Sequence, residues 1–484
     1  MNKSLLKLSI LASILLSTNI QAFDLEYQLD TLQQKVSELE KEKRSYGKMK
    51  HSYLDDMNDM EDRIDFLETE SALNSKMRFG ANFINNYNYF DVTTADNKNY
   101  TIDSFFRSKL NLNMFSKISD DLTFDATLSM YKNWGDSSLD PSSMYDSTLG
   151  FRPNSTNIYF TRAYVNYKKE FIKDLPIVFT LGRLPSTEGP SYDFQNDSVR
   201  QATFSALAFD GGVDGIITTA LTDKMTGLTN SSIRFAYGKG FQHDEGYMGA
   251  STIPKKTDLK DTNVFGIFGE AQIPGYKNSF LQAGYVKSSD MVADPSDGGL
   301  AQALKMPATT PNANVGDLVL YNASVVFKNF QKSNLDIFAH YTYSSAKPSG
   351  KTFGNYGLLS NGNDTTTKTG FAYWTGFRYN MNNGWKFGGE YNHGSKNWFS
   401  FTQGSNNIYN KLATRGNALE AYLLIPVNRY AHLKLGYINI NYDYTGSGSH
   451  LGEPMKISDM SNTPMGAMTL KKMNSYYFNF EVRF

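Results

Sequence analysis

The sequence contains no cysteine and only 14 prolines among its 484 residues. Without cysteine, neither a disulfide nor a thiolate metal site can form. The 48 basic residues equal the 48 acidic ones, so no basic excess points to a nucleic-acid partner. The six histidines show no pairing at metal-ligand spacing, and we therefore expect neither a metal nor a cofactor.

Beyond its N-terminus, the chain also lacks an apolar run near the roughly 18 residues that a membrane-spanning helix needs. The N-terminus itself carries Lys3 and Lys7, followed by an apolar run over residues 8–16. This order predicts a secretory signal peptide over residues 1–22, cleaved after Ala22. An exported protein without a spanning helix is either soluble or crosses a membrane with strands.

Aromatic residues and glycine, by contrast, are abundant, with 31 Tyr, 33 Phe and 38 Gly. From Met77 onward, aromatic residues alternate with polar ones, and clusters of Gly, Asn, Asp and Ser interrupt the alternation. A period of two is typical of strands bounded by turns. Sixteen strands are predicted, beginning near Met77, Asp103, Asp121, Asn157, Leu175, Phe209, Ser231, Asn263, Ser279, Asp317, Asn334, Gly370, Gly384, Asn417, Ala431 and Asn474.

The predicted connections between these strands alternate in length. The odd connections are long, over residues 91–102, 132–156, 185–205, 242–262, 289–316, 346–369, 397–416 and 445–473. The even ones are mostly short, over residues 119–120, 170–174, 221–229, 274–275, 329–333, 382–383 and 426–429. Short turns at one rim and long loops at the other are typical of outer-membrane barrels.

The fold prediction is therefore an all-β membrane protein. Residues 77–484 form a 16-stranded antiparallel transmembrane β-barrel, which an N-terminal α-helical coiled coil precedes. Bacterial outer-membrane lipid surrounds the barrel, and both chain ends lie in the periplasm.

The last strand supports this prediction, because its apolar side chains share one face and its polar ones the other. A terminal aromatic residue on such a strand resembles the assembly signal of outer-membrane barrels, so we expect the barrel assembly machinery as a partner. The residues of this predicted signal are Tyr476, Phe478, Phe480, Val482 and Phe484.

Residues 23–73 carry apolar side chains at alternating steps of four and three. This spacing, kept for about six heptads, predicts a periplasmic coiled coil and hence an oligomer. A homotrimer joined through residues 25–71 is the first expectation, and Lys43 and Lys50 at core positions set the register or mark a hinge. A single amphipathic helix packed on another surface is the alternative.

Four segments spread over both halves of the barrel carry a resemblance. They are residues 181–189 (LGRLPSTEG), 390–400 (EYNHGSKNWFS), 411–416 (KLATRG) and 444–454 (YTGSGSHLGEP). With these segments, the barrel region resembles an uncharacterised family of porin-like bacterial outer-membrane proteins, known only as a domain of unknown function. The resemblance implies a porin-like fold, and it implies no established substrate and no catalytic residues.

If the more apolar parity of each strand faces lipid, the other parity lines the interior. Basic side chains then collect on the earlier strands, with Asp125 and Asp214 as acidic exceptions, and acidic ones collect on the later strands. Facing rows of opposite charge would orient dipolar solutes. Alternatively, these charges only solvate a wide lumen or pair with neighbours. The predicted pore-lining residues are Arg78, Arg107, Lys109, Arg162, Arg183, Arg234, Glu390, Glu420 and Glu481.

Sixteen strands enclose a water-filled channel unless something narrows it. The long loops after Lys132 and Ser289 are candidates to fold inward. The segment 185–190 is the preferred constriction, although a plain surface turn would suit it equally.

The functional hypothesis is a trimeric porin for passive diffusion of small hydrophilic solutes, with no enzymatic activity. One alternative is a structural outer-membrane protein with a plugged barrel and a periplasmic tether. A second is a lipid hydrolase that uses His393 and Ser395, which share a face two residues apart. A histidine lying among interfacial aromatic residues explains that pair more simply.

Overall fold

The computed structural model describes residues 33–38, 77–134, 155–241, 259–293, 312–402 and 409–484. The chain separates into two compact units, residues 1–75 and 76–484. In the first unit, residues 33–38 form an exposed α-helix. The predicted signal peptide and most of the predicted coiled coil lie outside the described residues, so both remain predictions.

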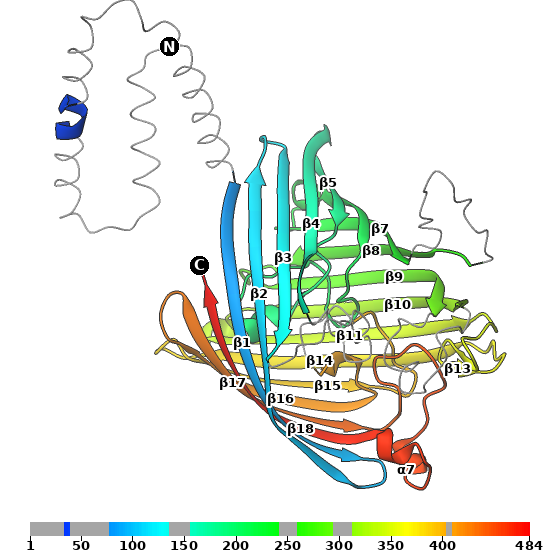
Figure 1. Cartoon of the computed structure of the whole chain (residues 1–484). Coiled ribbons are helices and arrows are strands. Elements are labelled where there is room, and N and C mark those ends of the chain that lie inside the picture. The colour runs from blue at the N-terminus through cyan, green and yellow to red at the C-terminus, as the bar shows by residue number, and fades with distance from the viewer. Residues whose placement is uncertain (1–32, 39–76, 135–154, 242–258, 294–311, 403–408) are drawn as a thin grey trace, which may run out of the picture. The chain divides into compact units, whose positions relative to one another are not determined.

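In the second unit, sixteen antiparallel strands form a closed barrel, which confirms the predicted fold class. Strands that follow one another in sequence lie side by side around the ring (Figure 1). The strands are β1 (Met77–Thr94), β2 (Asn99–Lys117), β3 (Leu122–Asn133), β4 (Ser155–Ile172), β5 (Leu175–Arg183), β6 (Asp214–Leu221), β7 (Ser232–Phe241), β8 (Thr262–Gln272), β9 (Phe280–Ala293), β10 (Ala313–Phe327), β11 (Leu335–Pro348), β14 (Lys368–Asn380), β15 (Lys386–Gly394), β16 (Gly416–Pro426), β17 (Ala431–Tyr442) and β18 (Leu470–Arg483). Strands β12 (Tyr356–Gly357) and β13 (Ser360–Asn361) form a separate hairpin in the loop between β11 and β14.

The ring closes where β1 pairs with β18. Their register runs from Asn82 opposite Arg483 to Thr94 opposite Leu470, so the C-terminal strand is bonded along most of its length. Every predicted strand is present. The largest difference in starting position is at β6, which begins at Asp214 rather than at Phe209.

Side chains alternate between the two faces of the wall, as β18 illustrates. Tyr476 is 57% exposed and Phe484 is 73% exposed, whereas the intervening Tyr477 and Glu481 are each only 7% exposed. Other strands show large apolar side chains on the outer surface in the same way, among them Phe79, Phe235, Phe265, Tyr321, Tyr341, Phe371 and Phe387. An apolar outer face with a polar inner face is the arrangement that a barrel in lipid requires.

Connection lengths follow the predicted parity with one exception. The first connection is only residues 95–98, in place of the predicted long loop 91–102. Pairing of β1 with β2 continues to Thr93 opposite Asn99. The chain then turns tightly, with Asn97 at a φ of 63° and the Asn97 amide donating to the Thr94 carbonyl oxygen at 2.9 Å.

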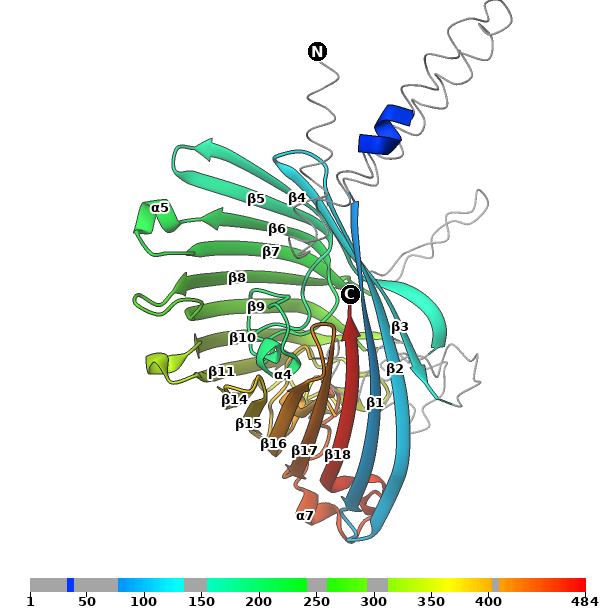
Figure 2. The same cartoon turned by 90° about the vertical axis from the view of Figure 1, so that its left-hand side faces the viewer.

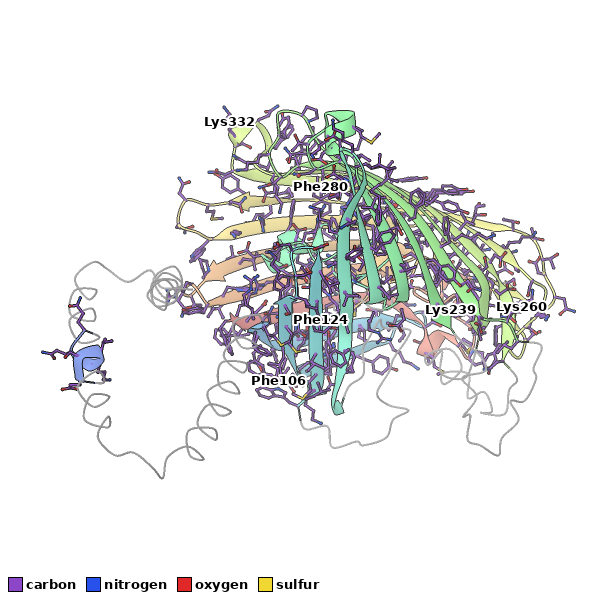
Figure 3. The ribbon with its side chains drawn as sticks, turned by 90° about the horizontal axis from the view of Figure 1, so that it is seen from above. Phe106, Phe124, Lys239, Lys260, Phe280 and Lys332 are labelled. Atoms are coloured by element: carbon purple, nitrogen blue, oxygen red, sulfur yellow. The ribbon has the colours of Figure 1, made fainter. Side chains whose placement is uncertain are left out.

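The other connections separate by length onto opposite rims. Figure 3 places Lys332, in a short turn, at one end of the strands and Lys239 and Lys260, beside a long loop, at the other. The long connections are residues 134–154, 184–213, 242–261, 294–312, 349–367, 395–415 and 443–469. The short ones are residues 118–121, 173–174, 222–231, 273–279, 328–334, 381–385 and 427–430.

Apolar side chains from the long loops pack inside the ring. One cluster joins residues of several loops, including Phe204, Phe353, Leu358, Phe399 and Leu451. A second surrounds helix α4 (Tyr192–Asn196), which lies within the ring of strands (Figure 2). The barrel therefore has a packed core of loop residues in addition to its strand wall.

Glycine allows close packing where inward-facing rings lie over the wall. A Cβ atom built at Gly436 of β17 would lie 2.1 Å from the Tyr477 ring. We therefore expect Gly436→Ala to displace that buried ring and to lower the free energy of unfolding by about 1–3 kcal/mol, as overpacking does. Urea denaturation of the full chain refolded into lipid vesicles measures this.

Gly269 of β8 is the matched control, because a Cβ atom there would meet nothing within 4 Å. Gly269→Ala should leave the urea midpoint unchanged. Equal effects of the two substitutions would contradict the packing argument.

Candidate functional site

The connection between β5 and β6, residues 184–213, turns into the barrel and carries α4. A Cβ atom at Gly189 would lie 2.2 Å from the Phe204 carbonyl oxygen, so glycine lets the two arms of this loop touch. At its tip, Phe194 meets Phe338 of β11 edge-on at a ring distance of 5.6 Å, and Tyr192 meets Trp374 of β14 at 5.4 Å. The loop thus crosses the interior and packs against the opposite wall.

Ion pairs hold the tip of the loop in place. The Lys328 ammonium lies 3.0 Å from an Asp193 carboxylate oxygen. Asp197, which follows α4, pairs with Lys386 of β15 and lies 3.1 Å from the Arg378 guanidinium of β14. These cations come from neighbouring elements between the end of β10 and β15, so the tip of the loop is fixed against that part of the wall.

The pKa of Asp197 reflects this arrangement. Burial would raise the pKa of its carboxyl group, but the Lys386 ammonium and the Arg378 guanidinium hold the pKa below its ordinary value. A carboxyl group whose pKa is lowered in the folded state adds stability above its unfolded-state pKa and loses that contribution as the pH falls through the folded-state pKa. The attachment of the loop through Asp197 is therefore complete at neutral pH and weakens only in acid.

Neutral hydrogen bonds and a C-terminal arginine complete the attachment. Ser205 Oγ lies 2.8 Å from His340 Nδ1, and Ser191 Oγ lies 3.1 Å from His340 Nε2 on β11. Arg483 Nη1 donates to the Asp197 carbonyl oxygen at 2.6 Å. The last strand, besides closing the barrel, thus holds the inward loop.

Two of the predicted pore-lining residues, Glu390 and Glu420, are buried side by side in the wall, each only 3% exposed. Lys411, from the loop between β15 and β16, is bonded to both carboxylates and is only 3% exposed. Trp374 Nε1 donates to Glu390 at 3.0 Å, and Gln195 Nε2 donates to Glu420 at 2.7 Å. Strand alternation could not indicate Lys411, because it belongs to a loop.

Glu481 is also engaged by neighbours. Its carboxylate oxygens lie 2.5 Å from Arg483 Nε and 3.3 Å from His432 Nε2. Glu420 and Glu481 both border a cavity of about 170 Å³, which Arg107 and Lys109 of β2 border as well. The Arg107 guanidinium in turn lies 4.5 Å from the centre of the Tyr131 ring.

A cavity of about 930 Å³ lies between the inward loop and the inner face of β1–β4. Neutral polar residues line much of it, including Asn82, Asn111, Asn113, Thr127 and Ser129. Its charged lining residues are Arg78, Lys109, Arg162, Arg200, Arg483, Asp125 and Glu188. Five of these seven are cationic.

Glu188 links the loop to this basic wall. Its carboxylate oxygens lie 3.3 Å from Lys109 Nζ and 3.7 Å from Arg162 Nη2. Arg162 also donates to Gln201 and, at 3.4 Å, to Thr187 Oγ1. Segment 185–190, the preferred constriction, therefore lies inside the barrel.

Arg78 and Arg234 border different cavities of the interior. Arg78 stacks over Phe115 at 4.6 Å and makes no ion pair among the described residues. Arg234 borders a separate cavity of about 620 Å³ beside Glu270. Arg200 reaches the same cavity and holds Glu270 through two bonds of 2.8 Å. Arg200 was not predicted, because it lies in a loop.

Arg183 was predicted to line the pore, but it lies on the other face of the wall. It shares the outward face of β5 with Leu181, which is 57% exposed, and pairs with Asp214 of β6 through bonds of 3.0 and 2.8 Å. Both residues stand at strand ends, and their side chains are 40% and 61% exposed. The alternation continues without a bulge, so neither Arg183 nor Asp214 faces the interior.

The pair considered for lipid hydrolysis has other partners. His393 Nδ1 lies 3.0 Å from Asn417 Oδ1, and the His393 ring packs against Tyr373 and Phe371. Ser395 Oγ accepts a bond from the Phe371 amide at 2.8 Å. His393 therefore sits in an outward aromatic cluster, and Ser395 closes a backbone turn.

The remaining predictions about the site fall partly outside the described residues. The loops after Lys132 and Ser289 include residues 135–154 and 294–311, which lie outside them. Within the described ranges, no group of His, Asp and Glu could hold a metal ion, and no helix has the length and apolar character needed to cross a membrane.

A family model covers residues 97–484, and the chain belongs to that family, whose description is a protein of unknown function (DUF3373). No curated protein matches the chain.

Solved structures with a similar chain path include the following three. Salmonella typhi OmpF in complex with daunomycin has 11% identity and a TM-score of 0.45 over 84% of this chain and 97% of its own. An anion-selective porin from Comamonas acidovorans has 10% identity and a TM-score of 0.47, over 84% and 99%. OmpT, an outer membrane protein of Vibrio cholerae, has 10% identity and a TM-score of 0.43, over 84% and 97%.

The buried cluster around Lys411 generates a stability prediction. Lys411→Ala would leave two enclosed carboxylates without their shared cation, so the free energy of unfolding should fall by roughly 3–5 kcal/mol. Urea denaturation of the vesicle-embedded protein measures the change.

Lys396 provides the control from the same loop. It pairs with Glu453 at 3.1 Å, and each of the two side chains is 44% exposed. Lys396→Ala should cost less than about 1 kcal/mol. An equally small loss for Lys411→Ala would mean that the cluster does not hold the loop inside the barrel.

Proposed function

We propose that the protein is a porin-like channel of the bacterial outer membrane, through which small hydrophilic solutes diffuse passively. The observation that carries the proposal is the cavity of about 930 Å³ inside the barrel, lined by charged and amide side chains. A space with such walls holds water, and a sixteen-strand barrel is wide enough to conduct it.

The outer surface supports a lipid setting. Phe79, Phe235 and Tyr321 are exposed on strands whose backbone groups are paired all around the ring. A closed ladder leaves no unpaired strand edge in an apolar medium, and exposed aromatic side chains lower the free energy of the barrel only where lipid covers them.

The proposal includes the export and assembly features predicted from the sequence. The signal peptide 1–22 directs secretion, the aromatic residues of β18 guide barrel assembly, and residues 25–71 join three copies in the periplasm. Outward placement of Tyr476, Phe478 and Phe484 leaves these side chains accessible to an assembly factor.

A barrel plugged by its own loops is the second candidate. It is favoured by the apolar cluster that joins Phe204, Phe353 and Leu451 from three different loops inside the barrel. Conduction across a membrane separates the two candidates.

Because the chain has no cysteine, a single introduced cysteine can report on the passage. Asn111 borders both the 170 Å³ and the 930 Å³ cavity. The full chain in planar lipid bilayers should show steady ion conductance, and Asn111→Cys should lose most of it on reaction with a bulky water-soluble thiol reagent.

The adjacent Leu112 is the matched control, because it is 41% exposed on the outer face of the same strand. Leu112→Cys should retain its conductance after the same treatment. A protein that never conducts at any voltage would instead support the plugged barrel.

A further inference from the structure

The two sides of the barrel interior differ in the charge that they offer to water. The 930 Å³ cavity beside β1–β4 has five cationic lining residues, Arg78, Lys109, Arg162, Arg200 and Arg483, against two acidic ones, Asp125 and Glu188. The 620 Å³ cavity has three of each, Arg200, Arg234 and Lys328 against Asp193, Asp223 and Glu270. Of these two cavities, only the larger has a positive excess.

The acidic residues of the other walls offset this excess only in part. Glu390 and Glu420 share Lys411 and are buried with it. Glu270 pairs with Arg200 and Glu481 pairs with Arg483, so these two pairs are neutral and the remaining excess is that of Arg78, Lys109 and Arg162 over Asp125 and Glu188. Because charges paired inside a packed cluster act weakly on water outside it, the field in the large cavity is set mainly by its own lining.

We propose that the passage beside β1–β4 favours small anions, such as carboxylates and phosphates, over cations of the same size. The inference rests on the proposed channel function. Arginine and lysine side chains supply donors that replace part of the hydration of an anion, and a low-dielectric wall strengthens their field.

Glu188 limits that preference. It lies on the inward loop, across the cavity from the wall strands, and its carboxylate is shared by Lys109 and Arg162. Partial neutralisation keeps each cation from holding an anion tightly, which conduction requires. The structure thus contains one residue whose loss should raise anion preference and several whose loss should lower it.

The experiment is the zero-current potential of the full chain in planar bilayers across a gradient of potassium chloride. The wild-type protein should pass chloride several-fold more readily than potassium, and potassium acetate in place of the chloride should preserve the sign. Conductance with equal or greater permeability for potassium would overturn the inference and leave the channel function standing. Absence of any conductance would overturn both.

Charge substitutions test which lining residues set the preference for anions. Arg78→Gln and Arg162→Gln should each lower the chloride-to-potassium permeability ratio, and Glu188→Gln should raise it. Arg78 makes no ion pair among the described residues, so its substitution tests the lining even if loss of Arg162 disturbs the loop.

Arg183→Gln is the matched control, because Arg183 lies on the outer face in a pair with Asp214. Its permeability ratio should equal that of the wild type. An unchanged ratio in all three lining variants, or a change in Arg183→Gln alone, would show that the proposed lining does not control selection.

Discussion

Pairing of the first strand with the last is the constraint on which the rest of the structure depends. Once β1 and β18 are bonded, no strand of the barrel is left with an unpaired edge. Closure also fixes which side of each strand is inside, because successive side chains of a strand point to opposite faces. Tyr477 and Glu481 must then face inward while Tyr476 and Phe478 face outward.

Closure creates an interior that the strands alone do not fill, and the long loops occupy part of it. The loop 184–213 is held by cations from several strands, whereas the loop 395–415 contributes Lys411 and Arg415 from its own sequence. Arg415 is fully buried and donates to the carbonyl oxygens of Trp398, Thr445 and Ser449 at 2.8–2.9 Å. It thereby ties two long loops together.

The strands could be predicted from the sequence because a period of two is a local signal, visible within eight or ten residues. The contacts of the inward loops could not, because they join distant positions: Lys411 is recognisable as a buried cation only once Glu390 and Glu420 are seen beside it. Arg183 was misplaced for a different reason. Odd positions of β5 carry Leu175, Ile177, Phe179 and Leu181 outward, so plain alternation puts Arg183 outward too, and the register with β6 runs without a shift to Arg183 opposite Asp214.

The sequence of the inward loop explains why the two sides of the interior differ in charge. Asp193 and Asp197, near its tip, meet Lys328, Arg378 and Lys386 and so neutralise the cations of the far wall. On the near side, the loop supplies only Glu188 against the lysine and arginines of β1–β4, and it adds Arg200. Asp193 and Asp197 of the loop thus serve its own attachment. A charge excess around the remaining cavity is therefore a consequence of how the loop is anchored.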